Sequence, residues 1–222
     1  MILIEDLFGD NENIFNSGFR IVQAVWKRIS TDISDAEEAK FVHAFIKGYD
    51  NRPSVRTSNP TGTKADQIID SLIRARISSF SDKDIARVKF DHRLSMAAEN
   101  IIGLILEEYI RVNVLKYGWS CCWGNSIKAV DFCSSDGKLL QVKNKSNTEN
   151  SSSNKIRQGT EIIKWFRLNA NNGKTNWDSL NKIIGKPALL SETGIKQFAE
   201  ELIKKNPNVL YLDEETFLKV YN

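Results

Sequence analysis

Histidine, cysteine and long apolar runs are all scarce in this chain of 222 residues. Its two histidines, His43 and His92, lie far from the three cysteines, so neither a histidine-centred triad nor a zinc site with ordinary ligand spacing is expected. No apolar run approaches the roughly 18–20 residues that span a bilayer, and the first residues lack the pattern of a signal peptide. We therefore expect a cytoplasmic protein with no membrane partner, whose acid–base chemistry depends on carboxylates, lysines or a metal ion.

The cysteine count also disfavours disulfide bonds. One thiol of Cys121, Cys122 and Cys133 stays unpaired under any pairing scheme, and adjacent cysteines rarely bridge each other. The low content of glycine (12) and proline (4) excludes a fibrous chain, and 41% hydrophobic residues is too many for a disordered one. These features predict a globular fold with reduced thiols.

Positive charge is concentrated in one part of the chain. Residues 138–167 contain seven lysines and arginines against two acids, although the whole chain has a net charge of only +3. Such a segment is typical of a surface that binds a polyanion, and on charge alone a solvated basic face is an equal alternative. Arg52, Arg56 and Lys64, in or beside the polar loop 50–63, are further candidates for phosphate contacts, although an exposed connector is the simpler interpretation.

The spacing of apolar residues changes from helical to strand-like near residue 118. Helices are predicted over residues 14–29, 34–48, 65–77, 94–116, 154–168 and 194–205, with a further helix start at Ser81 and Asp84. Strands are predicted over residues 119–123, 127–133, 138–144 and 209–212, with Ser135-Asp136-Gly137 as a turn. The fold class is therefore α/β (mixed α+β). We predict a helical region over residues 1–93, serving in dimerisation or in clasping DNA, and a core over residues 94–222.

Polar side chains interrupt two of the predicted strands. Asp131 lies on the second strand, and Gln141 and Lys143 share one face of the third, because side chains two positions apart point the same way. Burying such groups without partners costs several kcal/mol, so they require a metal ion, one another or solvent. An acid on one strand and an acid-x-lysine on the next form the layout of the PD-(D/E)XK nuclease core, in which a divalent cation neutralises the phosphodiester.

A longer segment resembles one family. The stretch 140–166, LQVKNKSNTENSSSNKIRQGTEIIKWF, resembles the corresponding part of SinI-type type II restriction endonucleases, and the resemblance extends over roughly residues 94–168. It implies a PD-(D/E)XK-like core with a central mixed sheet flanked by helices. It also implies a Mg²⁺-dependent endonuclease that cuts double-stranded DNA as a homodimer at a short, nearly palindromic site of the GG(A/T)CC or GGNCC type. A cognate DNA methyltransferase is the expected genetic partner.

The resemblance also assigns roles to individual residues. Asp131 is the expected central metal ligand, and Lys143 is expected to orient or activate water. Gln141 departs from the acidic consensus but ligates through its carbonyl oxygen, and the Val142 backbone carbonyl is a further expected ligand. Glu99, on the preceding helix, is expected to replace the missing carboxylate. The candidate DNA contacts are Asn144, Lys145, Asn147, Asn150, Ser151, Ser152, Ser153, Lys155 and Arg157.

Two alternatives stay open at this point. Besides a restriction nuclease, the sequence allows another nuclease with the same core, such as a repair or junction-resolving enzyme. It also allows a non-catalytic DNA-binding module in which Gln141 marks a degenerate site. Cleavage of mixed-sequence DNA in the presence of Mg²⁺ separates the two enzymes from the binding module.

Overall fold

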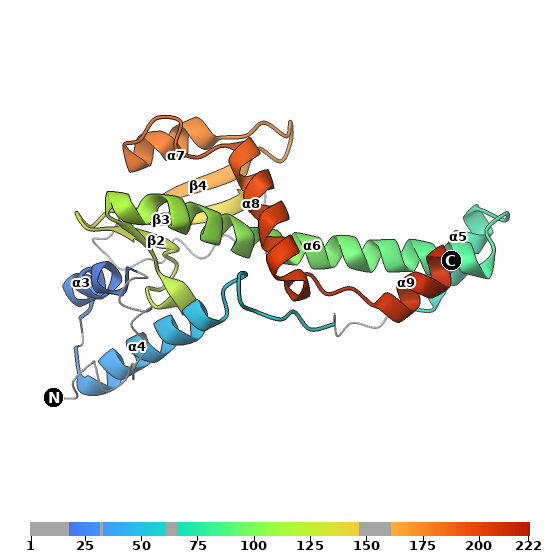
Figure 1. The fold of residues 1–222 in the computed structure, drawn as a ribbon, viewed down its shortest axis with the longest axis horizontal. Helices are drawn as coiled ribbons and strands as arrows, with labels where there is room; N and C mark the ends of the chain where they lie inside the picture. Colours follow the sequence, from blue (N-terminus) through green and yellow to red (C-terminus); the bar gives the residue numbers. More distant parts are fainter. Residues whose placement is uncertain (1–17, 32, 61–65, 147–160) are drawn as a thin grey trace. The chain divides into compact units, whose positions relative to one another are not determined.

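The computed structural model describes residues 18–31, 33–60, 66–146 and 161–222, which form helices and one sheet (Figure 1). The helices are α3 (Phe19–Ile29), α4 (Asp35–Asp50), α5 (Ile68–Arg76), α6 (Asp82–Val114), α7 (Trp177–Ile184), α8 (Glu192–Lys205) and α9 (Glu214–Tyr221). Single 3₁₀ turns are η1 (Leu115–Tyr117), η2 (Trp123–Asn125) and η3 (Pro207–Val209). The strands are β1 (Trp119–Cys121), β2 (Phe132–Ser134), β3 (Leu139–Lys145) and β4 (Ile162–Leu168). The predicted mixed α+β class is confirmed.

The sheet is mixed, with the strand order β1-β2-β3-β4. The pairs β1–β2 and β2–β3 are antiparallel, whereas β4 runs parallel to β3. The predicted turn between β2 and β3 is confirmed: Gly137 adopts a φ of 94°, which favours glycine, and its N–H donates to the Ser134 carbonyl over 2.8 Å. The second strand is shorter than predicted because Ala129, at a φ of 63°, leaves extended geometry.

The chain divides into two compact units. Unit 1 comprises residues 1–52 and 103–200, and unit 2 comprises residues 53–102 and 201–222. The predicted boundary at residue 93 does not coincide with this division, because residues 1–52 belong to unit 1 and residues 53–93 to unit 2. Within unit 1, α3 packs on β1 and β2, and α4 packs on η2. The approach of α4 to η2 requires glycine on both sides: a Cβ on Gly48 would lie 2.0 Å from the Gly124 backbone nitrogen.

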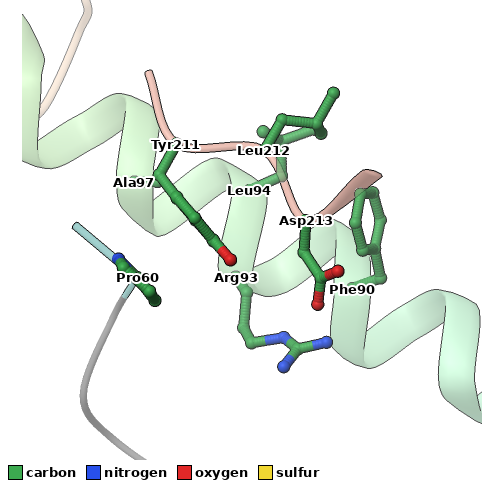
Figure 2. Close-up of a pocket in the computed structure, with 8 residues that line it drawn as sticks. All are labelled: Pro60, Phe90, Arg93, Leu94, Ala97, Tyr211, Leu212 and Asp213. Atoms are coloured by element: carbon green, nitrogen blue, oxygen red, sulfur yellow. The ribbon is translucent and has the colours of Figure 1, made fainter. Parts of the chain in front are cut away.

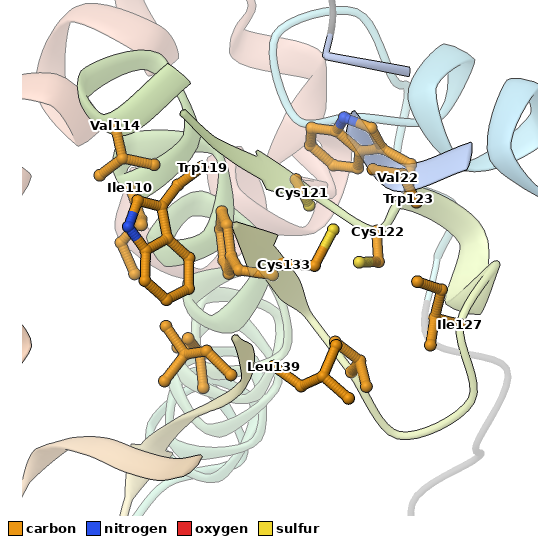
Figure 3. Packing of buried hydrophobic residues seen from close by; sticks show 14 of the residues in the cluster. Val22, Ile110, Val114, Trp119, Cys121, Cys122, Trp123, Ile127, Cys133 and Leu139 are labelled. Carbon is orange, nitrogen blue, oxygen red and sulfur yellow. The ribbon is translucent and has the colours of Figure 1, made fainter. Parts of the chain in front are cut away.

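Aromatic, aliphatic and sulfur-containing side chains form the core of unit 1. Figure 3 shows Cys121, Cys122 and Cys133 of the sheet region packed beside Trp119 and Trp123. All three cysteines are free thiols, as predicted, and burial raises the pKa of Cys121 and Cys122 well above the ordinary value. These thiols act as small apolar side chains and are poor nucleophiles in this position.

Several predicted helices are confirmed, and two are joined. The Ser34 hydroxyl accepts a hydrogen bond from the Glu37 N–H, which starts α4. Ser81 and Asp84 form the reciprocal cap expected at the start of α6, which then continues unbroken to Val114. None of the described helices combines the length and apolar character needed to cross a bilayer.

Two predicted elements are wrong. Residues 162–168, predicted to end a helix, form β4, and the rest of that predicted helix, 154–160, lies outside the described residues. Here the β-branched and aromatic residues Ile162, Ile163 and Trp165 pair in register with β3, and tertiary pairing outweighs the helical spacing. The predicted strand 209–212 is replaced by η3, whose turn bonds the Leu210 N–H to the Pro207 carbonyl.

Unit 2 is built around the first part of α6. The Lys89 ammonium lies 2.8 Å from an Asp70 carboxylate oxygen, which joins α5 to α6. The Phe90 ring of α6 packs against Phe217 and Tyr221 of α9, with ring centroids 5.9 and 6.0 Å apart. Figure 2 shows a small pocket of about 80 Å³ in this unit, which contains none of the predicted site residues. Its volume is far below that of an ordinary ligand site.

Candidate active site

Asp131 extends the β2 ladder by one residue and turns its carboxylate toward β3. Its N–H donates to the Leu140 carbonyl over 3.0 Å, and its own carbonyl accepts from the Cys122 N–H over 2.8 Å. One carboxylate oxygen, Oδ2, accepts a hydrogen bond of 2.7 Å from the Val142 N–H. The Asp131 carboxylate is thereby fixed beside the backbone of β3, between the positions of Gln141 and Lys143.

The strand register brings the predicted residues together. Phe132 pairs with Leu140, so the same register carried one step further sets Asp131 opposite Gln141. Gln141 is buried, and Lys143, two residues along the same strand, is partly buried. Burial raises the pKa of Asp131 and the Lys143 charge offsets part of this rise, so the Lys143 ammonium lies within electrostatic reach of that carboxylate. On the other side of β3, Gln141 pairs with Lys164 of β4.

We call Asp131, Gln141 and Lys143 the acid–lysine cluster. The helix acid beside this cluster is Glu107 of α6. Burial raises the pKa of Glu107 to about 8, the neighbouring Asp131 charge adds to the rise, and the Lys143 charge opposes it. Burial likewise raises the pKa of Asp131, which the Val142 N–H and Lys143 offset only in part. An ionised Asp131 thus helps to keep the neighbouring Glu107 protonated to a higher pH than an ordinary glutamate.

Glu99, the helix acid expected from the sequence, lies elsewhere on α6. It is exposed and belongs to unit 2, two helical turns before Glu107. Sequence reasoning missed Glu107, although a signal was present: Glu107 and Glu108 are the only acids in the apolar stretch 101–110. Glu108 is 3% exposed and lies 3.8 Å from the Arg52 guanidinium. Glu108 therefore forms an ion pair with Arg52 and is not the acid beside Asp131 and Lys143.

Arg52 has a structural environment rather than that of a free phosphate-binding side chain. Besides Glu108, it donates to the Tyr49 carbonyl over 2.8 Å and lies 3.9 Å above the Tyr49 ring. The Arg56 carbonyl accepts a hydrogen bond from Asn206 within unit 2. Lys64, the third basic residue of that predicted loop, lies outside the described residues.

The predicted DNA contacts fall mostly outside the described residues. Only Asn144 and Lys145, at the end of β3, are described. Asn144 accepts a hydrogen bond of 2.9 Å from Arg167 of β4, and Lys145 is exposed. The residues that lie outside are Asn147, Asn150, Ser151, Ser152, Ser153, Lys155 and Arg157.

Arg167 joins the ends of β3 and β4 to the start of α8. Its Nη1 donates to Glu192 over 2.6 Å, and the second Glu192 oxygen accepts from the Trp177 indole N–H over 3.0 Å. Burial opposes the ionisation of Glu192, but the hydrogen bonds from Trp177 and Arg167 outweigh it and lower the pKa of this carboxyl. This partly buried chain of charge-assisted bonds fixes the position of Asn144.

The donor set at the cluster suits a hard divalent cation. The Asp131 and Glu107 carboxylates and the Gln141 amide carbonyl are oxygen donors, which Mg²⁺ and Ca²⁺ prefer over nitrogen or sulfur. Mutual repulsion of the two carboxylates is the signature of a place where positive charge is favourable. Among the described residues, His, Cys, Asp and Glu side chains alone form no group of three or more that could hold a metal ion.

Comparison with known proteins gives one consistent result. The sequence profile of the SinI restriction endonuclease family matches residues 14–205. The type II restriction enzyme Eco47I of Escherichia coli is 40% identical over 155 residues, which cover 68% of this chain and 66% of Eco47I. The type II restriction enzyme SinI of Salmonella infantis is 35% identical over 184 residues, which cover 81% of this chain and 78% of SinI. The chain therefore belongs to the SinI restriction endonuclease family of type II restriction enzymes.

Proposed function

We propose that this chain is a cytoplasmic type II restriction endonuclease that hydrolyses phosphodiester bonds in both strands of DNA, with Mg²⁺ as its cofactor and the PD-(D/E)XK arrangement as its active site. The observation that carries the proposal is the meeting of Asp131, Glu107 and Lys143 beside strand β3. Family membership supports the reaction class, since both compared relatives are type II restriction enzymes.

Asp131, Glu107 and the Gln141 amide would hold the divalent cation. When bound, it neutralises charge on the phosphoryl oxygens of the scissile group. The Val142 N–H keeps the Asp131 carboxylate in one orientation, so the ligand is positioned before the substrate arrives. The Val142 carbonyl stays a proposed further ligand, and Glu107 takes the role expected of Glu99.

Lys143 and Glu107 supply the chain's own acid–base groups. The Lys143 ammonium lies beside the two carboxylates, where it is placed to orient the attacking water and to counter negative charge that develops during in-line displacement. Glu107, with a pKa of about 8, changes protonation state close to neutral pH. It gives up its proton when positive charge enters the site, so activity should rise with pH up to about 8.

The proposed substrate is duplex DNA with a short, nearly palindromic site of the GG(A/T)CC or GGNCC type. Asn144 and Lys145 lie at the strand end that leads into residues 147–157, and these residues are proposed to contact bases and phosphates. A near-palindrome cut in both strands calls for two symmetric active sites, hence a homodimer, and the genetic partner would be a methyltransferase that protects the same site.

The test is digestion of mixed-sequence DNA with and without Mg²⁺, followed by sequencing of the product ends. A restriction endonuclease gives discrete fragments whose ends share one sequence, and a chelator abolishes the reaction. Nicking that depends on DNA structure would indicate a repair or junction-resolving nuclease instead. If no enzyme concentration cleaves the DNA, the chain is a non-catalytic binding module and the proposed function is wrong.

A further inference from the structure

The side-chain amide of Asn144 is held in one orientation by its neighbour in the sheet. Arg167 of β4 donates from its Nε to the Asn144 Oδ1 over 2.9 Å. An arginine side chain has only donors and no acceptor, so the oxygen end of the amide is the end that can face it. The chemistry of Arg167 thus decides which way the amide is turned, with Oδ1 toward the guanidinium and Nδ2 on the other side.

Arg167 is itself fixed by further hydrogen bonds. Its side chain is 8% exposed, and its Nη1 donates to Glu192 over 2.6 Å. The second Glu192 oxygen accepts from the Trp177 indole N–H over 3.0 Å. Hydrogen bonds with a charged partner are stronger than those between neutral groups. The Asn144 amide is therefore positioned before any ligand arrives, which lowers the cost of binding one.

The two N–H donors of Asn144 Nδ2 have no partner among the residues that the structure describes. Asn144 is partly buried, near the end of β3, where the exposed Lys145 follows it. A free carboxamide offers a ligand both an acceptor and donors, but here the oxygen is turned toward the buried Arg167. The part of Asn144 left for a ligand is thus a pair of donors on one nitrogen.

One base of duplex DNA has an edge that matches such a group. In the major groove guanine presents two neighbouring acceptors, N7 and O6, whereas adenine presents an acceptor beside a donor. The usual contact of asparagine with adenine needs the amide oxygen as well as the nitrogen, and in Asn144 that oxygen faces Arg167. Cytosine presents a donor, and thymine a single acceptor. Donors without an available acceptor therefore favour guanine.

Phosphate oxygens are acceptors too, but the surroundings of Asn144 favour a base. Phosphate contacts gain most from positive charge, which the exposed Lys145 supplies next along the chain. Asn144 is neutral, and a fixed amide orientation serves to match hydrogen-bond direction rather than to attract charge. Because neighbouring side chains of a strand alternate, Asn144 lies on the face of β3 opposite to that of Lys143, so this contact is separate from the acid–lysine cluster.

We propose that Asn144 reads a guanine of the DNA site through its Nδ2 donors, and that Arg167 is the positioning residue that turns the amide toward it. The inference rests on the proposed function for its substrate, duplex DNA, but it does not depend on cleavage. It adds to the proposed DNA contacts a specific atom, the base that this atom recognises and the residue that orients it.

The test measures binding alone, with Ca²⁺ in place of Mg²⁺. Selection by the wild-type chain from a random-sequence pool of duplexes gives the preferred site, and 7-deazaguanine, which lacks the N7 acceptor, then replaces each guanine in turn. Asn144→Asp keeps the shape of the side chain and the contact with Arg167 but has no donors. Asn208→Asp, at an exposed asparagine of η3, is the matched control for the added negative charge.

We expect 7-deazaguanine at one position to weaken binding by wild type and by Asn208→Asp about 10-fold. Asn144→Asp should bind modified and unmodified duplexes within about 2-fold of each other, because the group that senses N7 is gone. Its melting temperature should equal or exceed that of wild type, since a carboxylate accepts more strongly from Arg167 than an amide does.

The role of Arg167 is tested with Arg167→Lys, which keeps the positive charge but not the planar set of donors. Its discrimination against 7-deazaguanine should fall below about 3-fold, because the amide is no longer held in one orientation. Its affinity for unrelated duplexes should stay that of wild type. A purely structural role would lower both affinities together, and discrimination as strong as that of wild type would show that Arg167 does not position the amide.

The proposal is overturned if wild type selects no guanine, or if Asn144→Asp stays as sensitive as wild type to 7-deazaguanine at every position. It is also overturned if neutral methylphosphonates, rather than 7-deazaguanine, abolish the difference between wild type and Asn144→Asp, since Asn144 would then contact phosphate. The proposed function fails separately. A chain that reads guanine through Asn144 but cleaves no DNA in Mg²⁺ would support this inference and contradict the nuclease. Site-specific cleavage, with Asn144→Asp as sensitive to 7-deazaguanine as wild type, would do the reverse.

Discussion

At the scale of single residues, the site depends on two carboxylates that hinder each other's ionisation. Asp131 is held by the Val142 N–H, while Glu107 is the more perturbed of the two, with a pKa of about 8. An acid kept protonated near neutral pH is poorly suited to structural ion pairing but well suited to a site that exchanges a proton for a cation. Replacing Glu107 therefore tests the proposed site directly.

We predict that Glu107→Gln lowers cleavage by at least ~10³-fold, since it removes one of two charged metal ligands. Glu99→Gln, a matched change on the same helix, should stay within about 3-fold of wild type, because Glu99 is exposed in unit 2. Initial rates of plasmid cleavage at saturating Mg²⁺ measure both. If Glu99→Gln lost cleavage and Glu107→Gln kept it, Glu99 and not Glu107 would be the helix acid of the site.

The raised pKa of Glu107 also makes the stability of the metal-free protein depend on pH. Between its ordinary value of 4.5 and about 8, the folded chain keeps a proton that the unfolded chain has lost, so stability falls as pH rises through this window. Glu107→Gln removes the effect. We expect the wild-type melting temperature, measured in chelator, to drop more from pH 5.5 to pH 8.5 than that of the variant. Parallel pH curves would contradict the assignment.

Asp131, Gln141 and Lys143 are predictable from sequence because the strand period of two is a local property. Glu107 is not, because its place depends on how α6 packs against the sheet, a contact between segments distant in sequence. The two acids inside the apolar stretch 101–110 are the available clue, yet the sequence does not say which of them pairs with Arg52.

At the scale of elements, the ends of β3 and β4 are held by a partly buried network of polar side chains. Arg167 bridges Asn144 and Glu192, and Trp177 completes the Glu192 contacts. A helix was expected here because Ile162, Ile163 and Phe166 fit a helical period. Instead, the segment pairs in parallel with β3 and forms a strand. Pairing between segments distant in sequence is hard to predict from one sequence.

We predict that Arg167→Leu destabilises the fold by about 2 kcal/mol, because it leaves the partly buried Glu192 carboxylate and the Asn144 amide without their donor. Lys182→Ala, at an exposed position of α7, should change the free energy of unfolding by less than about 0.5 kcal/mol. Urea unfolding at neutral pH measures both. A loss below about 1 kcal/mol for Arg167→Leu would show that the network carries little stability.

The end of β3 also carries Lys145, one of the described lysines of the basic segment. Lys145 is exposed and positively charged, as expected of a phosphate contact. Lys145→Ala should weaken DNA binding about equally for cognate and unrelated sequences and reduce the slope of log K against log salt by about 1. Fluorescence anisotropy titrations at several salt concentrations measure this. Loss of affinity for the cognate site alone would indicate a base contact instead.

At the scale of the whole molecule, the candidate active site and most of the exposed apolar side chains belong to different units. Unit 1 contains the sheet and the acid–lysine cluster, and unit 2 contains most of the exposed apolar side chains. The mixed α+β class follows from the change of period near residue 118, whereas the division into units does not, because each unit combines segments distant in sequence. Under the proposed function, two-fold symmetric DNA calls for two symmetric active sites, so a second copy would be needed for cutting both strands.

The most direct test of the proposed site is cleavage by Asp131→Ala and Lys143→Ala beside wild type, with DNA affinity measured in parallel. We predict discrete fragments from wild type in Mg²⁺, a loss of cleavage of at least ~10³-fold in each variant, and dissociation constants for the cognate duplex within about 5-fold of wild type. Cleavage at the wild-type rate by either variant would contradict a hydrolytic site built on these two residues.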